Sequence, residues 1–186
     1  MMANAMNWQA TALDARSARK PENLPDSITY ILGDVGSDVW RAENYDVILC
    51  LGLYYHLSQE MQHRLLRRCS GKPLILDTHF ANPPGKEKSR YGPLGETYEK
   101  NGEVGADYIE PSQSNDAERK SSQLLASFEN TTSWWQTPES LRLTLHQFGW
   151  PHIWTFNYLQ EEFIQRTFFI CYTADLTGTG ASGIRF

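Results

Sequence analysis

Two short apolar segments, residues 46–52 (DVILCLG) and 73–80 (PLILDTHF), constrain the fold more than any other part of this sequence. Each is apolar at successive positions rather than at alternate ones, so both faces of the extended chain are expected to be buried. Such strands are typical of a parallel sheet covered by helices. Between them, residues 58–69 predict a helix with Ser58 as its N-cap and Gly71 beyond its C-terminus. The segment therefore predicts a strand–helix–strand unit with a right-handed crossover.

The rest of the chain adds strands to this unit. Another helix is expected to begin at Pro138, after Thr137 as N-cap, and to end before Gly149. The last two strands are separated by a few residues, which predicts an antiparallel hairpin. Strands are expected at residues 10–15, 28–35, 152–159 and 166–174. The predicted fold class is α/β, with a sheet that is mostly parallel and ends in this antiparallel hairpin.

Residues 81–130 differ from the rest, because they are rich in Pro, Gly, Ser, Asn and Glu. A connection of this length is far longer than usual, so we expect an inserted cap or substrate-binding region, with a short helix at residues 117–128. The predicted organisation is a single domain over residues 1–174 with this insertion, followed by a flexible tail at residues 175–186.

Polar residues and a glycine follow four of the expected strands. They are Asp14, Asp34, Gly52 with Tyr54, Tyr55 and His56 after it, and Asp77 with Thr78 and His79 after it. Ligands of open α/β sheets bind beyond the carboxyl ends of the strands. Strand ends are also polar for the simple reason that they meet water, so both interpretations stay open at each position.

The charge balance restricts the partners. A net charge of −5, from 17 basic and 22 acidic residues, argues against a general nucleic-acid coat. Arg64, Arg67 and Arg68 form either a local basic patch or a solvated helix face. The three cysteines fit no zinc spacing and no complete disulfide framework, so reduced thiols in the cytoplasm are expected. Neither a signal peptide nor a membrane span is expected.

At this point the sequence resembles the class I S-adenosylmethionine-dependent methyltransferases, over residues 9 to 174. YDVILCLGLYYHL (45–57) resembles the fourth-strand motif of that family, and ALDA (12–15) resembles the end of its second strand. ITYILGDV (28–35) resembles its third strand, and the two last strands resemble its final hairpin. NTTSWWQTPESLRLTLHQFGW (130–150) resembles a late segment in one branch of these enzymes.

This resemblance implies roles for individual residues, with S-adenosylmethionine as cofactor. Asp14 would accept hydrogen bonds from the two ribose hydroxyls, which one carboxylate can do. Asp34 would bind the adenine amino group, with the backbone of Val35 beside the ring; the alternative is that Asp34 is a turn residue. Leu51 and Gly52 would lie under the methionine portion.

Methyl transfer needs mainly in-line positioning, and a base only if the acceptor is protonated. His56 is the first candidate for this base and His79 the second, and each is also compatible with a purely structural role. Tyr55, Trp134 and Trp135 are candidates to contact the acceptor, or the tryptophans cover the core. A metal site at His56, Asp77 and His79 is not expected, because no tight ligand spacing supports it.

One element of the resemblance is missing. A GxGxG loop should follow the first strand, yet only MMANAMNWQ stands before residues 10–15, so the first strand and the glycine-rich loop are expected to be absent from an N-terminally truncated chain. The second and fourth strands of the family would then close up, be completed by a partner chain in a homo- or hetero-oligomer, or leave exposed edges.

The expected function is methyl transfer to a small-molecule acceptor, and the alternative is a non-catalytic remnant or partner subunit. A nicotinamide-binding Rossmann enzyme is a third interpretation. It needs the same missing glycine-rich turn, so it explains the sequence no better. A cysteine hydrolase is disfavoured because Cys50 lies inside an apolar strand.

Overall fold

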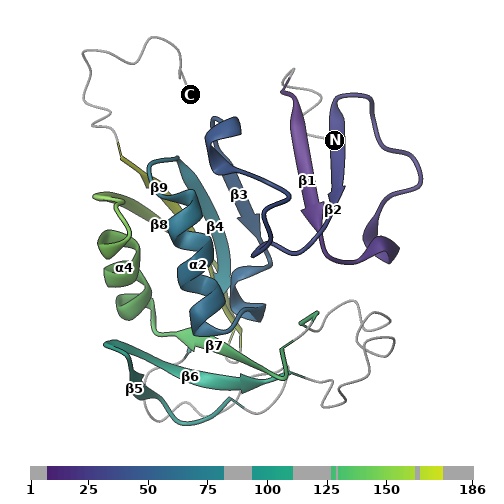
Figure 1. Ribbon diagram of the computed structural model, residues 1–186. Coiled ribbons are helices and arrows are strands. Elements are labelled where there is room, and N and C mark those ends of the chain that lie inside the picture. The colour runs from purple at the N-terminus through teal and green to yellow at the C-terminus, as the bar shows by residue number, and fades with distance from the viewer. Residues whose placement is uncertain (1–7, 82–93, 111–126, 129, 162–163, 174–186) are drawn as a thin grey trace, which may run out of the picture.

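The computed structural model describes residues 8–81, 94–110, 127–128, 130–161 and 164–173. Within these ranges the chain forms an α/β fold with three hydrogen-bonded sheets (Figure 1). The strands are β1 (Ala10–Asp14), β2 (Ile28–Leu32), β3 (Ile48–Leu51), β4 (Leu74–His79), β5 (Tyr98–Lys100), β6 (Glu103–Ile109), β7 (Thr132–Gln136), β8 (His152–Glu161) and β9 (Ile164–Tyr172). The α-helices are α2 (Gln59–Cys69) and α4 (Pro138–Gln147).

Both helices begin and end at the residues expected. The Ser58 side chain accepts a hydrogen bond from the Met61 N–H at the start of α2, and the Thr137 side chain accepts one from the Ser140 N–H at the start of α4. These caps satisfy amide groups that have no partner within the helix. Beyond the C-terminal ends, Gly71 and Gly149 have φ of +83° and +104°, which glycine adopts without steric cost.

The largest sheet has the strand order β3-β4-β9-β8. Strands β3 and β4 pair in parallel, β9 is antiparallel to β4, and β8 is antiparallel to β9. This confirms the parallel pairing of the two apolar segments and the antiparallel hairpin. Strands β1 and β2 pair in parallel with each other in a sheet of their own.

A three-stranded antiparallel sheet, β5-β6-β7, has two strands within residues 81–130, where an inserted cap or substrate-binding region with a short helix was expected, and its third strand follows that region. Strands β5 and β6 are joined by Asn101 and Gly102, with φ of 52° and 82°. An Asn-Gly pair with positive φ at both residues makes the tight turn typical of β-hairpins. The strands β5 and β6 were not predicted, because Asn and Gly were interpreted as loop composition rather than as a hairpin signal. The helix expected at 117–128 falls largely outside the described residues, as does the tail 175–186.

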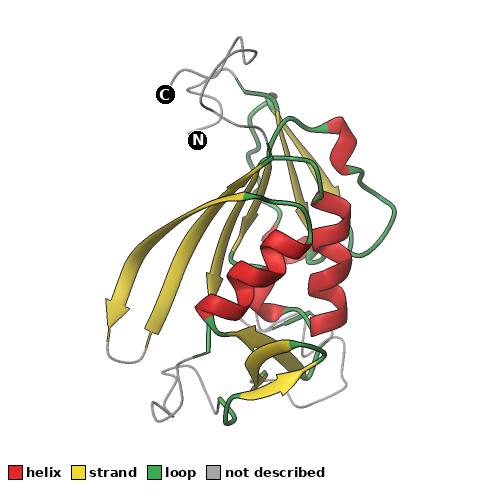
Figure 2. Ribbon diagram, turned by 90° about the vertical axis from the view of Figure 1, so that its left-hand side faces the viewer, coloured by secondary structure: helices red, strands yellow, loops and turns green. Residues whose placement is uncertain are grey.

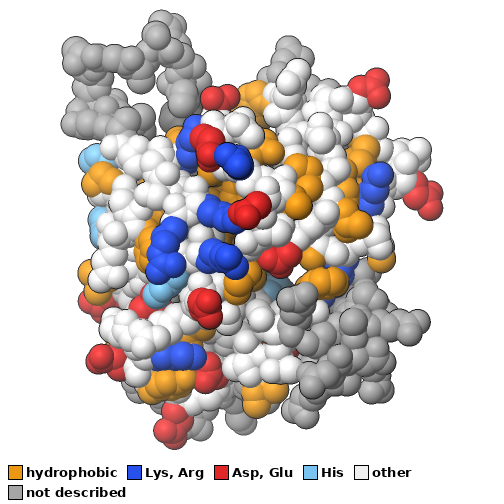
Figure 3. All heavy atoms as spheres, in the orientation of Figure 1, with side chains coloured by type: hydrophobic (Ala, Val, Ile, Leu, Met, Phe, Trp, Pro, Cys, Tyr) orange, Lys and Arg blue, Asp and Glu red, His pale blue; other side chains and the backbone are white. Residues whose placement is uncertain are grey.

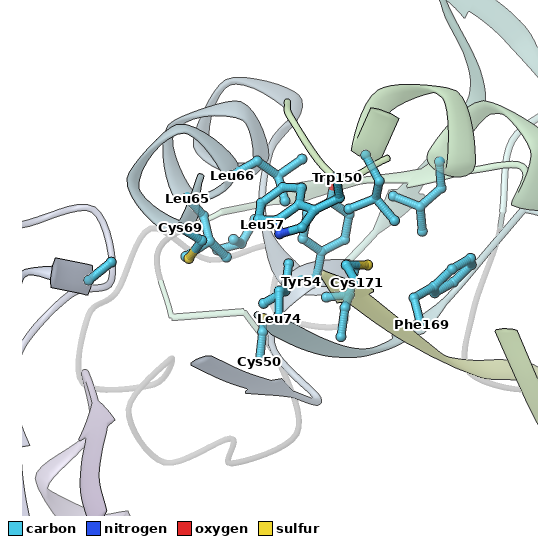
Figure 4. Packing of buried hydrophobic residues seen from close by; sticks show 14 of the residues in the cluster. Cys50, Tyr54, Leu57, Leu65, Leu66, Cys69, Leu74, Trp150, Phe169 and Cys171 are labelled. Atoms are coloured by element: carbon cyan, nitrogen blue, oxygen red, sulfur yellow. The ribbon is translucent and has the colours of Figure 1, made fainter. Parts of the chain in front are cut away.

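Helices α2 and α4 cover the same face of the largest sheet (Figure 2). The core lies between these helices and the sheet. It contains Tyr54, Leu66 and Trp150, and none of these side chains is more than 2% exposed. Figure 4 shows the three cysteines within this core, where all are buried free thiols. Burial raises the pKa of Cys69 and of Cys171 to about 12, and raises that of Cys50 further. They are therefore apolar core residues rather than reactive groups.

The opposite face of the largest sheet is apolar and open among the described residues. The pairing registers place Leu49, Ile75, Ile170 and Trp154 in one row across the four strands. Leu49, Leu51, Trp154 and Phe156 are about half exposed or more. The expectation that residues 46–52 form a central strand buried on both faces was therefore wrong: β3 is the edge of its hydrogen-bonded sheet.

The three arginines of α2 lie on a charged surface. Figure 3 shows basic side chains gathered on this face with acidic ones between them. Arg68 donates hydrogen bonds to Ser37 O and Asp38, and Arg67 lies over the ring of Phe148 at 5.8 Å. These contacts favour the interpretation as a solvated helix face with partners in the same chain. Among the described helices, none combines the length and the apolar character needed to cross a membrane.

Candidate functional site

The carboxyl ends of β3 and β4 meet around Gly52. The Arg166 side chain of β9 donates from Nε to Asp77 Oδ1 at 2.8 Å and from Nη2 to Asp77 Oδ2 at 2.5 Å. Gly52 has a φ of +69°, and a Cβ there would lie 3.3 Å from Arg166 Nη2 and 3.7 Å from the Tyr55 hydroxyl. The positive φ and the close guanidinium of Arg166 both favour glycine at this position.

An aromatic cluster lies beside this glycine. His79 stacks on Trp135 with ring centroids 5.2 Å apart, and Tyr108 stacks on the same indole at 4.5 Å. Tyr55 meets both His56 and His79, with centroids 4.3 Å and 4.4 Å away. The two candidate bases are thus brought together through Tyr55. His79 is buried, whereas the His56 side chain is 16% exposed.

His56 is held by a buried carboxylate. Its Nδ1 lies 3.1 Å from Oε1 of Glu110, which follows β6 and is 1% exposed. The same carboxylate accepts hydrogen bonds from the Ser133 hydroxyl and, at 2.9 Å, from the Ser127 N–H. Because both of these groups donate, Glu110 acts as an acceptor, and the matching arrangement at His56 is a proton on Nδ1. That leaves Nε2 as the nitrogen with a free lone pair.

The two aspartates at the ends of β1 and β2 make turns. Asp14 Oδ1 accepts a hydrogen bond from the Arg16 N–H at 2.8 Å, and Asp34 Oδ1 accepts one from the Gly36 N–H at 2.6 Å. The hydrogen bond from Gly36 therefore supports the interpretation of Asp34 as a turn residue. A carboxylate has about four lone-pair sites, so these bonds leave each aspartate able to accept more. Val35 packs into the core, and its carbonyl accepts a hydrogen bond from the Trp40 indole.

The structure separates two residues that the sequence placed together. Trp135 joins the aromatic cluster and donates from Nε1 to Tyr55 O at 2.8 Å. Trp134 is 1% exposed and donates from Nε1 to Glu103 Oε2 at 3.0 Å, within a different buried network. Successive residues of a strand point to opposite faces, so only Trp135 lies beside Tyr55. Leu51 is 55% exposed.

Glu110 and Arg166 were missed by sequence reasoning. Glu110 stands in the polar region 81–130, where nothing distinguishes it from its neighbours. Arg166 carried a signal, since it is a basic residue at the start of the apolar strand RTFFICY. No group of three or more His, Cys, Asp or Glu side chains suited to a metal ion occurs among the described residues.

Comparison with known proteins places the fold. No family model and no curated protein sequence matches the chain. The N-terminal domain of EvdMO1, solved in the presence of S-adenosylhomocysteine and D-fucose, is 14% identical with a TM-score of 0.59, over 93% of this chain and 80% of that one. A SAM-dependent methyltransferase from Methanosarcina mazei is 11% identical with a TM-score of 0.53, over 94% and 87%.

A third similar structure has 1,6-didemethyltoxoflavin bound. The Burkholderia thailandensis 1,6-didemethyltoxoflavin-N1-methyltransferase, which also has S-adenosylhomocysteine bound, is 10% identical with a TM-score of 0.55. It matches 90% of this chain, which spans 62% of that enzyme. At these identities the likeness shows the fold.

Proposed function

From the class I S-adenosylmethionine-dependent methyltransferase fold that this chain has, we propose that it takes part in methyl transfer from S-adenosylmethionine to a small-molecule acceptor. One observation carries the proposal. The two parallel pairs β1–β2 and β3–β4 end in Asp14, in Asp34 just beyond β2, and in Gly52 just beyond β3. These are the positions at which ligands bind in open α/β sheets.

The side chains at these ends fit the cofactor. Asp14 keeps acceptor capacity for the ribose hydroxyls, and Asp34 keeps it for the adenine amino group, beside Val35. The methionine portion would lie over Leu51 and Gly52, near Arg166 and Tyr55. Arg166 adds a positive charge there, suited to a carboxylate, although its ion pair with Asp77 already uses two of its donors.

The bound cofactor would supply an activated methyl group. The chain would then contribute orientation, with Tyr55 and Trp135 against a flat or apolar acceptor, and exclusion of water. His56 Nε2 would remove a proton from an acceptor that carries one. Glu110 is a positioning residue in this scheme, because its bond to Nδ1 orients the imidazole. His79, buried against Trp135, is the second candidate.

The cofactor proposal is tested by titrating the ¹⁵N-labelled chain with S-adenosylhomocysteine. Backbone resonances of residues at Asp14, Asp34 and Gly52 are expected to shift together. Asp14→Asn is expected to weaken binding about tenfold, through loss of charge-assisted hydrogen bonds. Asp46→Asn serves as the control, since Asp46 precedes β3 and is exposed at the opposite end. Shifts scattered over the surface, or none up to about 1 mM ligand, would contradict the proposal.

The tautomer of His56 can be tested separately, without a substrate. Imidazole ¹⁵N shifts distinguish the two neutral tautomers, and we expect the Nδ1–H form for His56. Glu110→Gln is expected to reduce the population of that form, because an amide can turn its NH₂ group toward Nδ1. Glu139→Gln, in the first turn of α4, is the matched control. An Nε2–H tautomer in the unaltered chain would remove His56 from the role of base.

A further inference from the structure

The residues proposed to bind the cofactor and those proposed to act on the acceptor lie on different sheets. Asp14 ends β1, in the two-stranded sheet β1-β2. His56 follows β3 of the largest sheet, and its partner Glu110 follows β6 of the three-stranded sheet. A side chain that contacts both groups can transmit the occupation of one to the other, because coupling travels through contiguous physical contacts.

Arg16 makes contacts on both sides. Its backbone N–H donates to Asp14 Oδ1 at 2.8 Å. Its guanidinium carbon lies 5.5 Å from the centre of the Phe128 ring. The residue before Phe128 is Ser127, whose N–H donates to Glu110 Oε2 at 2.9 Å. The side chain of Arg16 therefore runs from the end of β1 to the segment that holds Glu110.

The charge of Arg16 is buried near two carboxylates. Arg16 is 6% exposed. Burial lowers the pKa of Arg16 and the charge of Arg19 lowers it further, whereas the carboxylates of Asp14 and Glu110 act in the opposite direction. Glu110 is 1% exposed, and a buried carboxylate needs compensating charge and hydrogen-bond donors. Arg16 thus supplies positive charge to two carboxylates at once, and one of them is the partner of His56.

We propose that Arg16 is a positioning residue that couples the cofactor site to the base, because the charge of Arg16 acts more strongly on Glu110 once a ribose occupies Asp14. The inference rests on the proposed function, in which the ribose hydroxyls donate to Asp14. Those hydrogen bonds disperse the negative charge of Asp14 and leave Glu110 as the main counter-charge of Arg16. An ionised Glu110 accepts the proton on His56 Nδ1, and His56 Nε2 is then able to accept a proton from the acceptor.

The direction of the effect follows from the charges. A buried carboxylate that loses its compensating charge is driven to take up a proton, and a protonated carboxyl group donates to Nδ1 instead of accepting from it. A weaker attraction between Arg16 and Glu110 therefore favours the Nε2–H tautomer of His56, in which Nε2 cannot act as a base. A stronger attraction favours the Nδ1–H tautomer. Cofactor binding and formation of the base are linked in this way.

The test measures the imidazole ¹⁵N signals of His56 at pH 8 without any ligand. Arg16→Met removes the charge and keeps a long side chain, and it is expected to lower the ratio of the Nδ1–H to the Nε2–H tautomer about threefold or more. Arg16→Lys keeps the charge and should restore most of that ratio. Arg19→Met is the matched control. Arg19 pairs with Asp14 at 3.4 Å, but its side chain is 36% exposed, so water screens its charge and the ratio should stay unchanged.

A double-mutant cycle measures the coupling itself. Asp14→Asn removes the charge that competes for Arg16, so it is expected to raise the Nδ1–H population of His56. In the Arg16→Met background the same change should leave His56 unaltered. The Asp14 side chain is 25% exposed, so Asp14→Asn is expected to fold, and it tests the coupling even if Arg16→Met does not fold. No response of His56 to Asp14→Asn, or an equal response in both backgrounds, would overturn the proposal.

Addition of S-adenosylhomocysteine completes the test. It is expected to move His56 toward the Nδ1–H form in the unaltered chain and to have no such effect in Arg16→Met. Binding that shifts the backbone signal of Asp14 but leaves His56 unchanged would overturn the inference and leave the proposed function standing. Absence of binding would contradict the proposed function, and the ligand-free cycle would then decide by itself whether Arg16 connects Asp14 to His56.

Discussion

Replacing Glu103 by leucine is expected to lower the free energy of unfolding by about 3–5 kcal/mol. Glu103 opens β6 and is 4% exposed. Its carboxylate accepts hydrogen bonds from Gln59 at 2.7 Å, Trp134 at 3.0 Å and Thr144 at 2.9 Å, and contacts His63 Nε2 at 2.6 Å. Leucine would leave these groups buried without their acceptor, and each orphaned group costs about 1–3 kcal/mol.

Urea unfolding monitored by tryptophan fluorescence measures this loss. Glu103→Gln keeps the shape and one carbonyl acceptor, so it should cost about 1–2 kcal/mol. Glu99→Leu, on the exposed neighbouring strand β5, should change the stability by less than about 0.5 kcal/mol. A Glu103→Leu chain as stable as the unaltered one would show that α2, β7 and α4 do not depend on this carboxylate.

The stability of the chain is expected to fall steeply above pH 9. Burial raises the pKa of Cys69 and Cys171 to about 12 in the folded chain and that of Cys50 further, whereas unfolded thiols titrate near about 8.5. Below that pH both states hold the protons, so the stability is at its full value. Above it only the unfolded state releases them, so each thiol costs about 1.4 kcal/mol per pH unit.

Three thiols together should therefore remove about 4 kcal/mol per pH unit between roughly pH 9 and pH 12. Above pH 10 Tyr54 contributes in the same direction, because burial raises its pKa well above the usual value. Urea midpoints at pH 8, 9 and 10 measure the slope. Cys171→Ala is the matched variant: it should be less stable at pH 8 but lose stability about one third more slowly. An unchanged slope in that variant would show that Cys171 ionises within the fold.

The helices and most strands could be predicted because their signals are local. Ser58 and Thr137 satisfy amides three residues away, and Gly71 and Gly149 adopt a positive φ where each helix ends. The antiparallel sheet around Asn101 and Gly102 had a local signal too, but the polar composition of residues 81–130 concealed it.

The candidate site was predictable only in part. Asp14, Asp34 and Gly52 follow apolar runs, so their places at strand ends can be inferred from the pattern. Glu110 reaches His56 across 54 positions of sequence, and Arg166 reaches Asp77 across 89. Such contacts depend on how β6 and β9 pack against the rest of the fold. The hydrophobic pattern within each strand does not reveal that packing.

The sequence by itself determined where α2 and α4 begin and end, roughly where β1, β2, β3, β4, β8 and β9 lie, and which strand ends carry polar groups. These are short-range consequences of hydrophobic period, capping and backbone freedom. Only the tertiary structure decided which strands are neighbours. It therefore decided that Leu49 and Leu51 lie beside an unpaired edge rather than inside a sheet. Strand pairing joins backbone groups distant in sequence, and every strand presents the same N–H and C=O groups at its edges.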